Sequence, residues 1–104
     1  MKGLDFGGLM KQAQKMQKDM ERIRAELADR VVEGSAGGGK VTAQASGAQQ
    51  LVALKIAPEV VDPADVGMLE DLVTVAVNQA LKKSSDLAQT EMAKVTGGMG
   101  IPGM

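Results

Sequence analysis

The sequence contains no histidine and no cysteine, and Phe6 is its only aromatic residue. Without histidine or cysteine the chain cannot form a zinc finger, a disulfide framework or a cysteine nucleophile, and it lacks the imidazole that most often serves as a general base. The scarcity of aromatic rings removes the platforms on which single-stranded DNA and RNA modules stack bases. We therefore expect a protein that is not an enzyme and has no cofactor, metal or small-molecule substrate.

The sequence also lacks long hydrophobic runs. Its first ten residues are interrupted by Asp5 and three glycines, and no later stretch reaches the length that crosses a membrane. We therefore expect a cytoplasmic protein without a membrane partner. The formal net charge is only −1, so any attraction to a polyanion has to come from a local patch of basic residues.

One glycine-rich segment resembles a nucleotide-binding loop. Gly34, Gly39 and Lys40 occupy the glycine and lysine positions of the pattern G-x-x-x-x-G-K. Val41 stands where that pattern needs a serine or threonine to hold magnesium, and it opens a strand where the pattern needs a helix. We interpret the segment as a hairpin loop between two strands.

The residue pattern predicts one α+β domain over residues 1–96, in the order helix, three-stranded antiparallel sheet, helix, followed by a flexible Gly/Met-rich tail at 97–104. The first helix is expected from Leu9 to Asp29. Alternating apolar residues predict strands near 31–32, 41–46 and 51–56, the last ended by Pro58. The second helix is expected to begin with Asp62 as N-cap and Pro63 in the first turn, and to end near Val95.

The predicted first helix has two distinct faces. An apolar stripe repeats at alternating steps of four and three residues, which is the spacing of a helix that packs along one narrow seam. Its members are Leu9, Ala13, Met16, Met20, Ile23 and Leu27. The opposite face carries a basic ridge about 16 Å long, at 1.5 Å per residue, formed by Lys11, Lys15, Lys18 and Arg22. Lys82, Lys83 and Lys94 would extend this ridge if the two helices lay side by side.

The first half of the second helix is apolar around about 240° of its circumference, at 100° per residue. A helix buried so widely needs two neighbours, and a three-stranded sheet supplies one. We expect the second neighbour to be another copy of the chain, in a homodimer, although the first helix of the same chain is an alternative. The residues expected in the shared core or dimer interface are Leu69, Leu72, Val73, Ala76, Val77, Val52, Leu54 and Ile56.

Four segments, taken in their order along the chain, resemble those of a known protein family. They are GGLMKQAQKM at 7–16, VEGSAGGGKV at 32–41, MLEDLV at 68–73 and GGMGIPG at 97–103. Together they closely resemble the YbaB/EbfC family of small bacterial nucleoid-associated proteins. The resemblance implies a tweezer-like homodimer with long projecting helices, binding to double-stranded DNA, and a role in nucleoid organisation and gene regulation.

On this resemblance, the projecting first helix maps onto Leu9 to Asp29 and places the basic ridge where DNA contact is expected. The candidate DNA-binding residues are therefore Lys11, Lys15, Lys18, Arg22, Lys82 and Lys83. Because the ridge holds one arginine and the nearby glutamines are scattered around the helix, we expect contact mainly with phosphates and little sequence specificity. The alternative is a homodimeric protein-interaction module for which DNA binding is incidental.

Overall fold

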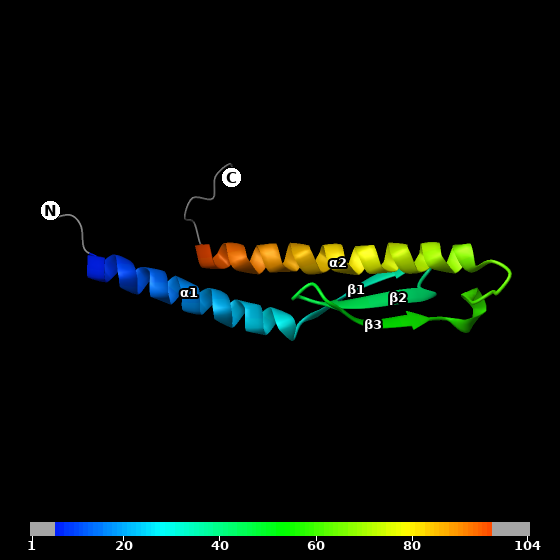
Figure 1. Ribbon diagram of the computed structural model, residues 1–104, viewed down its shortest axis with the longest axis horizontal. Helices are drawn as coiled ribbons and strands as arrows, with labels where there is room; N and C mark the ends of the chain where they lie inside the picture. Colours follow the sequence, from blue (N-terminus) through cyan, green and yellow to red (C-terminus); the bar gives the residue numbers. More distant parts are fainter. Residues whose placement is uncertain (1–5, 97–104) are drawn as a thin grey trace, which may run out of the picture.

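The computed structural model describes residues 6–96 and has the predicted order of elements (Figure 1). Helix α1 spans Phe6–Ala28, the strands β1, β2 and β3 span Val31–Ala36, Val41–Ser46 and Leu51–Ile56, a short 3-10 helix η1 spans Pro58–Val60, and helix α2 spans Val66–Thr96. The tail expected at 97–104 lies outside the described residues. Within them, no helix is long and apolar enough to cross a membrane.

The three strands form an antiparallel sheet in the order β1-β2-β3. The β1–β2 hairpin turns through three glycines with positive φ, at 37, 38 and 39, so the segment that resembled a nucleotide-binding loop is a hairpin turn. Lys40, at the end of this turn, forms an ion pair with Glu59. A register shift between β2 and β3 places Leu51 opposite Ala45 and leaves Val52 outside the paired register. The bulge puts Leu51 and Leu54 on the same side of the sheet, whereas uninterrupted alternation would place them on opposite sides.

Helix α2 packs across one face of the sheet, mainly over β1 and β2. The buried core consists of small apolar side chains, namely those of Val41, Ala43, Ala45, Val60, Ala76 and Ala80. Gly34 of β1 permits the close approach of the helix, because a Cβ atom at this position would lie 2.4 Å from the Ala76 carbonyl oxygen. The helix therefore contacts the sheet almost backbone to backbone at this point.

Among residues 6–96, helix α1 is attached to the sheet at its C-terminal end. The Gly47 amide donates to the carbonyl oxygens of both Leu27 and Arg30, at 2.9 Å each, and so ties the end of α1 to the β2–β3 turn. From this base α1 runs antiparallel to α2 and extends past its end (Figure 1). The radius of gyration is 20.3 Å, whereas a compact chain of this length has about 13 Å.

The helix boundaries differ from the sequence-based prediction at two places. Helix α1 begins at Phe6, three residues before Leu9. Helix α2 begins after Asp65, whose Oδ1 accepts from the Met68 amide at 3.2 Å and caps the helix. The prediction that Asp62 is the N-cap was wrong: Asp62 accepts from the amide of Ala64, two residues on, and closes a turn before the helix.

The residues expected in the core or dimer interface divide into two groups. Ala76 is fully buried, and five others are partly buried against the core, namely Leu69, Leu72, Val73, Val77 and Ile56. Val52 and Leu54 are instead 53% and 39% exposed in the single chain. Leu54 pairs with buried Ala43 and thus lies on the α2 side of the sheet, but α2 does not cover β3. One edge of the α2-facing surface therefore remains open.

Candidate nucleic-acid interface

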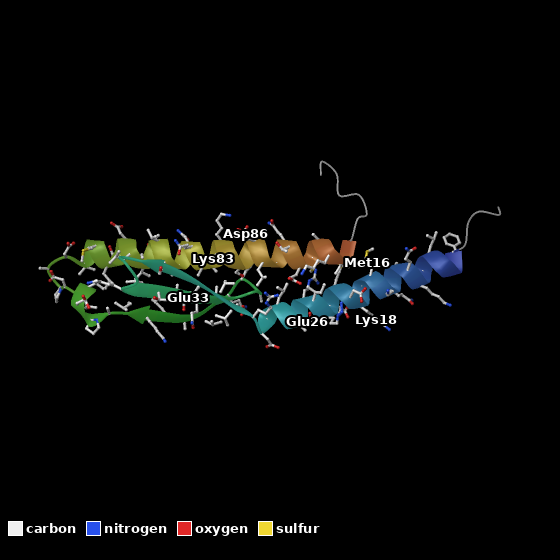
Figure 2. The ribbon with its side chains drawn as sticks, turned by 180° about the vertical axis from the view of Figure 1, so that it is seen from behind. Met16, Lys18, Glu26, Glu33, Lys83 and Asp86 are labelled. Carbon is white, nitrogen blue, oxygen red and sulfur yellow. The ribbon has the colours of Figure 1, made fainter. Side chains whose placement is uncertain are left out.

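The basic ridge lies on the solvent-facing side of α1. Ile23 and Leu27 of the apolar stripe are the two buried residues of this helix, whereas Lys11, Lys15 and Lys18 are exposed. Figure 2 shows Met16 on the side of α1 nearer α2 and Lys18 on the opposite side. The 3.6-residue helical period thus presents the ridge away from the rest of the chain.

The four residues of the ridge differ in their ionic environment. The Arg22 guanidinium lies between two carboxylates, 3.8 Å from Asp19 and 4.0 Å from Glu26. Among residues 6–96, the ammonium groups of Lys11, Lys15 and Lys18 have no carboxylate within 4.0 Å. The uncompensated positive charge therefore lies in the N-terminal two thirds of α1, in a part of the helix that projects from the fold.

The two candidate residues on α2 do not extend this ridge within the single chain. Lys83 donates to the Glu33 carbonyl oxygen at 2.8 Å, and Lys82 pairs with Asp86 at 3.0 Å. Figure 2 shows Lys83 beside Glu33, over the sheet, far along the molecule from Lys18 on α1. Lys83 thus serves the backbone of strand β1, and in the single chain it does not lie beside the ridge.

Two basic residues, Arg30 and Lys94, surround Glu91 where the end of α1 lies near α2. Glu91 of α2 is 3.4 Å from the Arg30 guanidinium and 3.1 Å from the Lys94 ammonium group. The hydrogen bond from Lys94, together with the positive charges of Lys94 and Arg30, lowers the pKa of the Glu91 carboxyl. The Arg30–Glu91 pair therefore links α2 to the chain at the end of α1, whereas Lys94 pairs with Glu91 within α2.

Sequence reasoning did not single out Arg24, which lines a cleft of about 460 Å³ between α1, α2 and the β2–β3 turn. The cleft is otherwise lined by uncharged residues, among them Leu27, Gln49, Ala88 and Met92. At 100° per residue, Arg24 lies near the apolar stripe of the helix. A charged residue at the edge of a buried stripe is the sequence feature that could have identified it. The cleft holds no cluster of acidic or metal-binding side chains among the described residues.

The sequence matches the YbaB/EbfC DNA-binding family over residues 1–99. The chain belongs to this family. A nucleoid-associated protein of Alkaliphilus metalliredigens is 51% identical over 100 residues, which cover 96% of this chain and 88% of that protein. A nucleoid-associated protein of Acetivibrio thermocellus is 54% identical over 104 residues, which cover 95% of this chain and 92% of the relative.

The fold of this YbaB/EbfC family member also occurs in a solved structure. The crystal structure of the uncharacterized protein HP0035 from Helicobacter pylori superposes with a TM-score of 0.81 and covers 90% of this chain and 99% of that one. The two sequences are 21% identical, so this similarity concerns the fold. The family match and the relatives identify the chain as a nucleoid-associated DNA-binding protein.

Proposed function

We propose that this nucleoid-associated protein binds double-stranded DNA mainly through the phosphate backbone, using Lys11, Lys15 and Lys18 of α1. The supporting observation is that these three lysines are exposed on a projecting helix and have no carboxylate within 4.0 Å among residues 6–96. A lysine ammonium group without an ionic partner can neutralise a phosphate and release its counterions. Arg22 contributes less, because Asp19 and Glu26 already compensate its charge.

The composition of the ridge supports low sequence specificity. Arginine is the residue that most often reads guanine edges, and the only arginine of the ridge is engaged with two carboxylates. Lysine acts on phosphate as a point charge and carries little base information. We therefore expect affinities for unrelated duplexes to be similar, as suits a role in nucleoid organisation rather than recognition of one operator.

The protein is further proposed to act as a homodimer that joins through β3. The outer edge of β1 is already occupied by α2, because Gln79 accepts from the Ser35 amide at 2.9 Å and Lys83 donates to the Glu33 carbonyl oxygen. The outer edge of β3 pairs with no strand in the described part of the chain, and Val52 and Leu54 are exposed there. An uncovered sheet edge with apolar side chains is a surface on which a second copy can pack.

A dimer of this kind would present two ridges. Each α1 projects from its own sheet, so a central β3–β3 junction would leave both helices free to contact one duplex. Two ridges double the number of neutralised phosphates, and the affinity should then depend steeply on salt. This arrangement favours DNA binding as the function over a protein-interaction module with incidental DNA binding, because it uses the exposed charges as well as the apolar edge.

The test is a salt titration of binding to several unrelated duplexes by the variant Lys15→Gln/Lys18→Gln. The slope of log K against log salt should fall in magnitude by about 1.8 per chain, because each lost phosphate contact removes about 0.9. The measurement is fluorescence anisotropy at four or more salt concentrations, with circular dichroism to verify that the helices are intact.

The matched control is Lys40→Gln/Lys82→Gln, which removes the same charge at two residues that lie outside α1 and β3 and are paired with Glu59 and Asp86. Its salt slope should stay within error of the parent protein. If both double variants reduce the slope equally, net charge rather than the ridge governs binding. If the ridge variant binds unrelated duplexes as the parent does, the ridge is not the DNA-binding surface.

A further inference from the structure

The apolar stripe of α1 is covered at one end and uncovered at the other. Ile23 is 6% exposed, whereas Leu9 is 53% exposed, although both belong to the same stripe. Met16 and Met20, between them, are intermediate. Exposure therefore rises toward the N-terminal end of the helix, and the stripe continues for several turns beyond the point where the fold buries it.

The reason is that α2 ends before α1 does. The cleft at the base brings Arg24 and Leu27 beside Ala88 and Met92, and the two helices run antiparallel. Counting from these neighbours, the last residue of α2, at position 96, lies roughly level with Met20. Within residues 6–96, the part of α1 from Phe6 to about Asp19 therefore has no helix beside it (Figure 1). At 1.5 Å per residue this overhang is about 20 Å long.

The eight residues that follow α2 have the length and composition to cover this overhang. Their sequence is GGMGIPGM, which holds three large apolar side chains and no charged side chain. Eight extended residues span about 26 Å, which exceeds the overhang. Gly97 and Gly98 come directly after α2 and permit the chain to change direction there, and methionine adapts well to an irregular apolar surface.

We propose that the C-terminal segment 97–104 docks on the uncovered stripe of α1 in the same chain, with Met99, Ile101 and Met104 against Leu9, Ala13 and Met16. The segment then continues the cover that α2 provides up to its end. Because the stripe and the basic ridge lie on opposite faces of α1, the docked segment leaves Lys11, Lys15 and Lys18 accessible. Its effect is to hold the DNA-contacting part of α1 in helical form, since a helix of this length without packing is only marginally stable.

The first test measures amide hydrogen exchange in the full chain and in the variant Met99→Ser/Ile101→Ser/Met104→Ser. Exchange over residues 9–18 should become at least roughly tenfold faster, because that factor already corresponds to the loss of about one buried apolar side chain and the variant replaces three. The strands and the middle of α2 should remain unchanged. The matched control Met99→Leu/Ile101→Leu/Met104→Leu keeps the apolar contacts and should retain the slow exchange. Equal exchange in all three proteins would overturn the proposal.

The second test uses the absence of native cysteine. The variant Leu9→Cys/Ile101→Cys should form a disulfide within one chain on mild oxidation, seen as a faster-migrating band of unchanged mass on a non-reducing gel. A band of twice the chain mass would mean that the segment reaches a second copy, and absence of any disulfide would mean that the two sites do not meet. Either of these two results overturns docking within one chain.

Discussion

At the scale of single residues, the contact between α2 and the sheet depends on Gly34. A Cβ atom here would approach the Ala76 carbonyl oxygen to 2.4 Å and the Ala80 amide nitrogen to 2.5 Å, both of them backbone atoms that cannot rotate away. Position 34 therefore has no room for a side chain. This restriction links a single position on β1 to the distance between the two layers of the fold.

We expect Gly34→Ala to lower the free energy of unfolding by about 1–3 kcal/mol, as overpacking of a close-packed core does. Chemical denaturation followed by circular dichroism measures this change. The matched control is Gly67→Ala in the first turn of α2, where the nearest atom to a new Cβ is 4.0 Å away, and where alanine should leave stability equal or raise it. A Gly34→Ala protein as stable as the parent would contradict the close packing of α2 on β1.

The residue chemistry of the ridge could be read from the sequence only in part. The periodicity places Lys11, Lys15, Lys18 and Arg22 on one face because helical geometry is local. Whether each charge is compensated depends on the rotamers that bring carboxylates within reach, and periodicity does not specify those. The sequence showed that Asp19, Glu21 and Glu26 are near enough to pair with the ridge, but not with which residue; the structure pairs Asp19 and Glu26 with Arg22 and leaves the three lysines without such a pair among residues 6–96.

At the scale of secondary-structure elements, the order helix, three strands, helix was predicted correctly, because the change from a 3.6-residue to a two-residue period is a local signal. The first residue of α2 was predicted incorrectly. Asp62 and Asp65 are both acceptable N-caps, and Pro63 favoured the earlier one. The choice depends on where the chain leaves η1 to cross from the sheet to the helix, which is a tertiary property.

The sequence also could not predict how much of the apolar stripe of α1 is buried. The stripe from Leu9 to Leu27 is uniform as a pattern, but only its last two members are buried. Burial depends on how far α1 extends past α2, which follows from the position of the base at Gly47 and of the end of α2.

The junction between the elements α1 and α2 should respond to pH through Glu91. The pKa of this carboxyl is lowered in the folded protein, so its ionised form stabilises the fold; that contribution is complete above the ordinary pKa of 4.5 and is lost as the pH falls through the lowered value. We therefore expect Glu91→Gln to have a lower Tm than the parent at neutral pH, with the difference closing as the pH falls below the ordinary pKa of 4.5 and through the lowered value.

Thermal unfolding at a series of pH values measures this difference. Glu70→Gln serves as the control for the loss of one negative charge, because the Glu70 carboxylate has no ion pair within 4.0 Å among residues 6–96. A Tm difference for Glu91→Gln that persists unchanged at the lowest pH would show that the ion pairs with Arg30 and Lys94 are not its cause.

At the scale of the whole molecule, the proposed homodimer predicts a particle of twice the 10.8 kDa chain mass. We expect Val52→Asp to shift the protein toward a single chain, because it would bury a charge in the β3 junction without a partner. Light scattering coupled to size-exclusion chromatography measures the mass.

Val31→Asp is the matched control, because Val31 on β1 is 54% exposed and Val52 is 53% exposed. The control protein should keep the mass of the parent. Should Val52→Asp fail to fold, the Tm of the parent protein should still rise with concentration, as it does for a dimer. A parent protein of single-chain mass at every concentration would exclude the dimer.

Because α1 is attached at one end, a small rotation at that end displaces the far end of the helix by a large distance. Its 23 residues extend about 34 Å from the base, so a rotation of about 10° there would carry the far tip through about 6 Å, the width of a DNA minor groove. Such a rotation would turn about the amide of Gly47, which donates hydrogen bonds to the carbonyl oxygens of Leu27 and Arg30. If the three lysines bind a duplex as proposed, their alignment with it is governed at the opposite end of the helix, by a residue that carries no charge and lies outside the ridge.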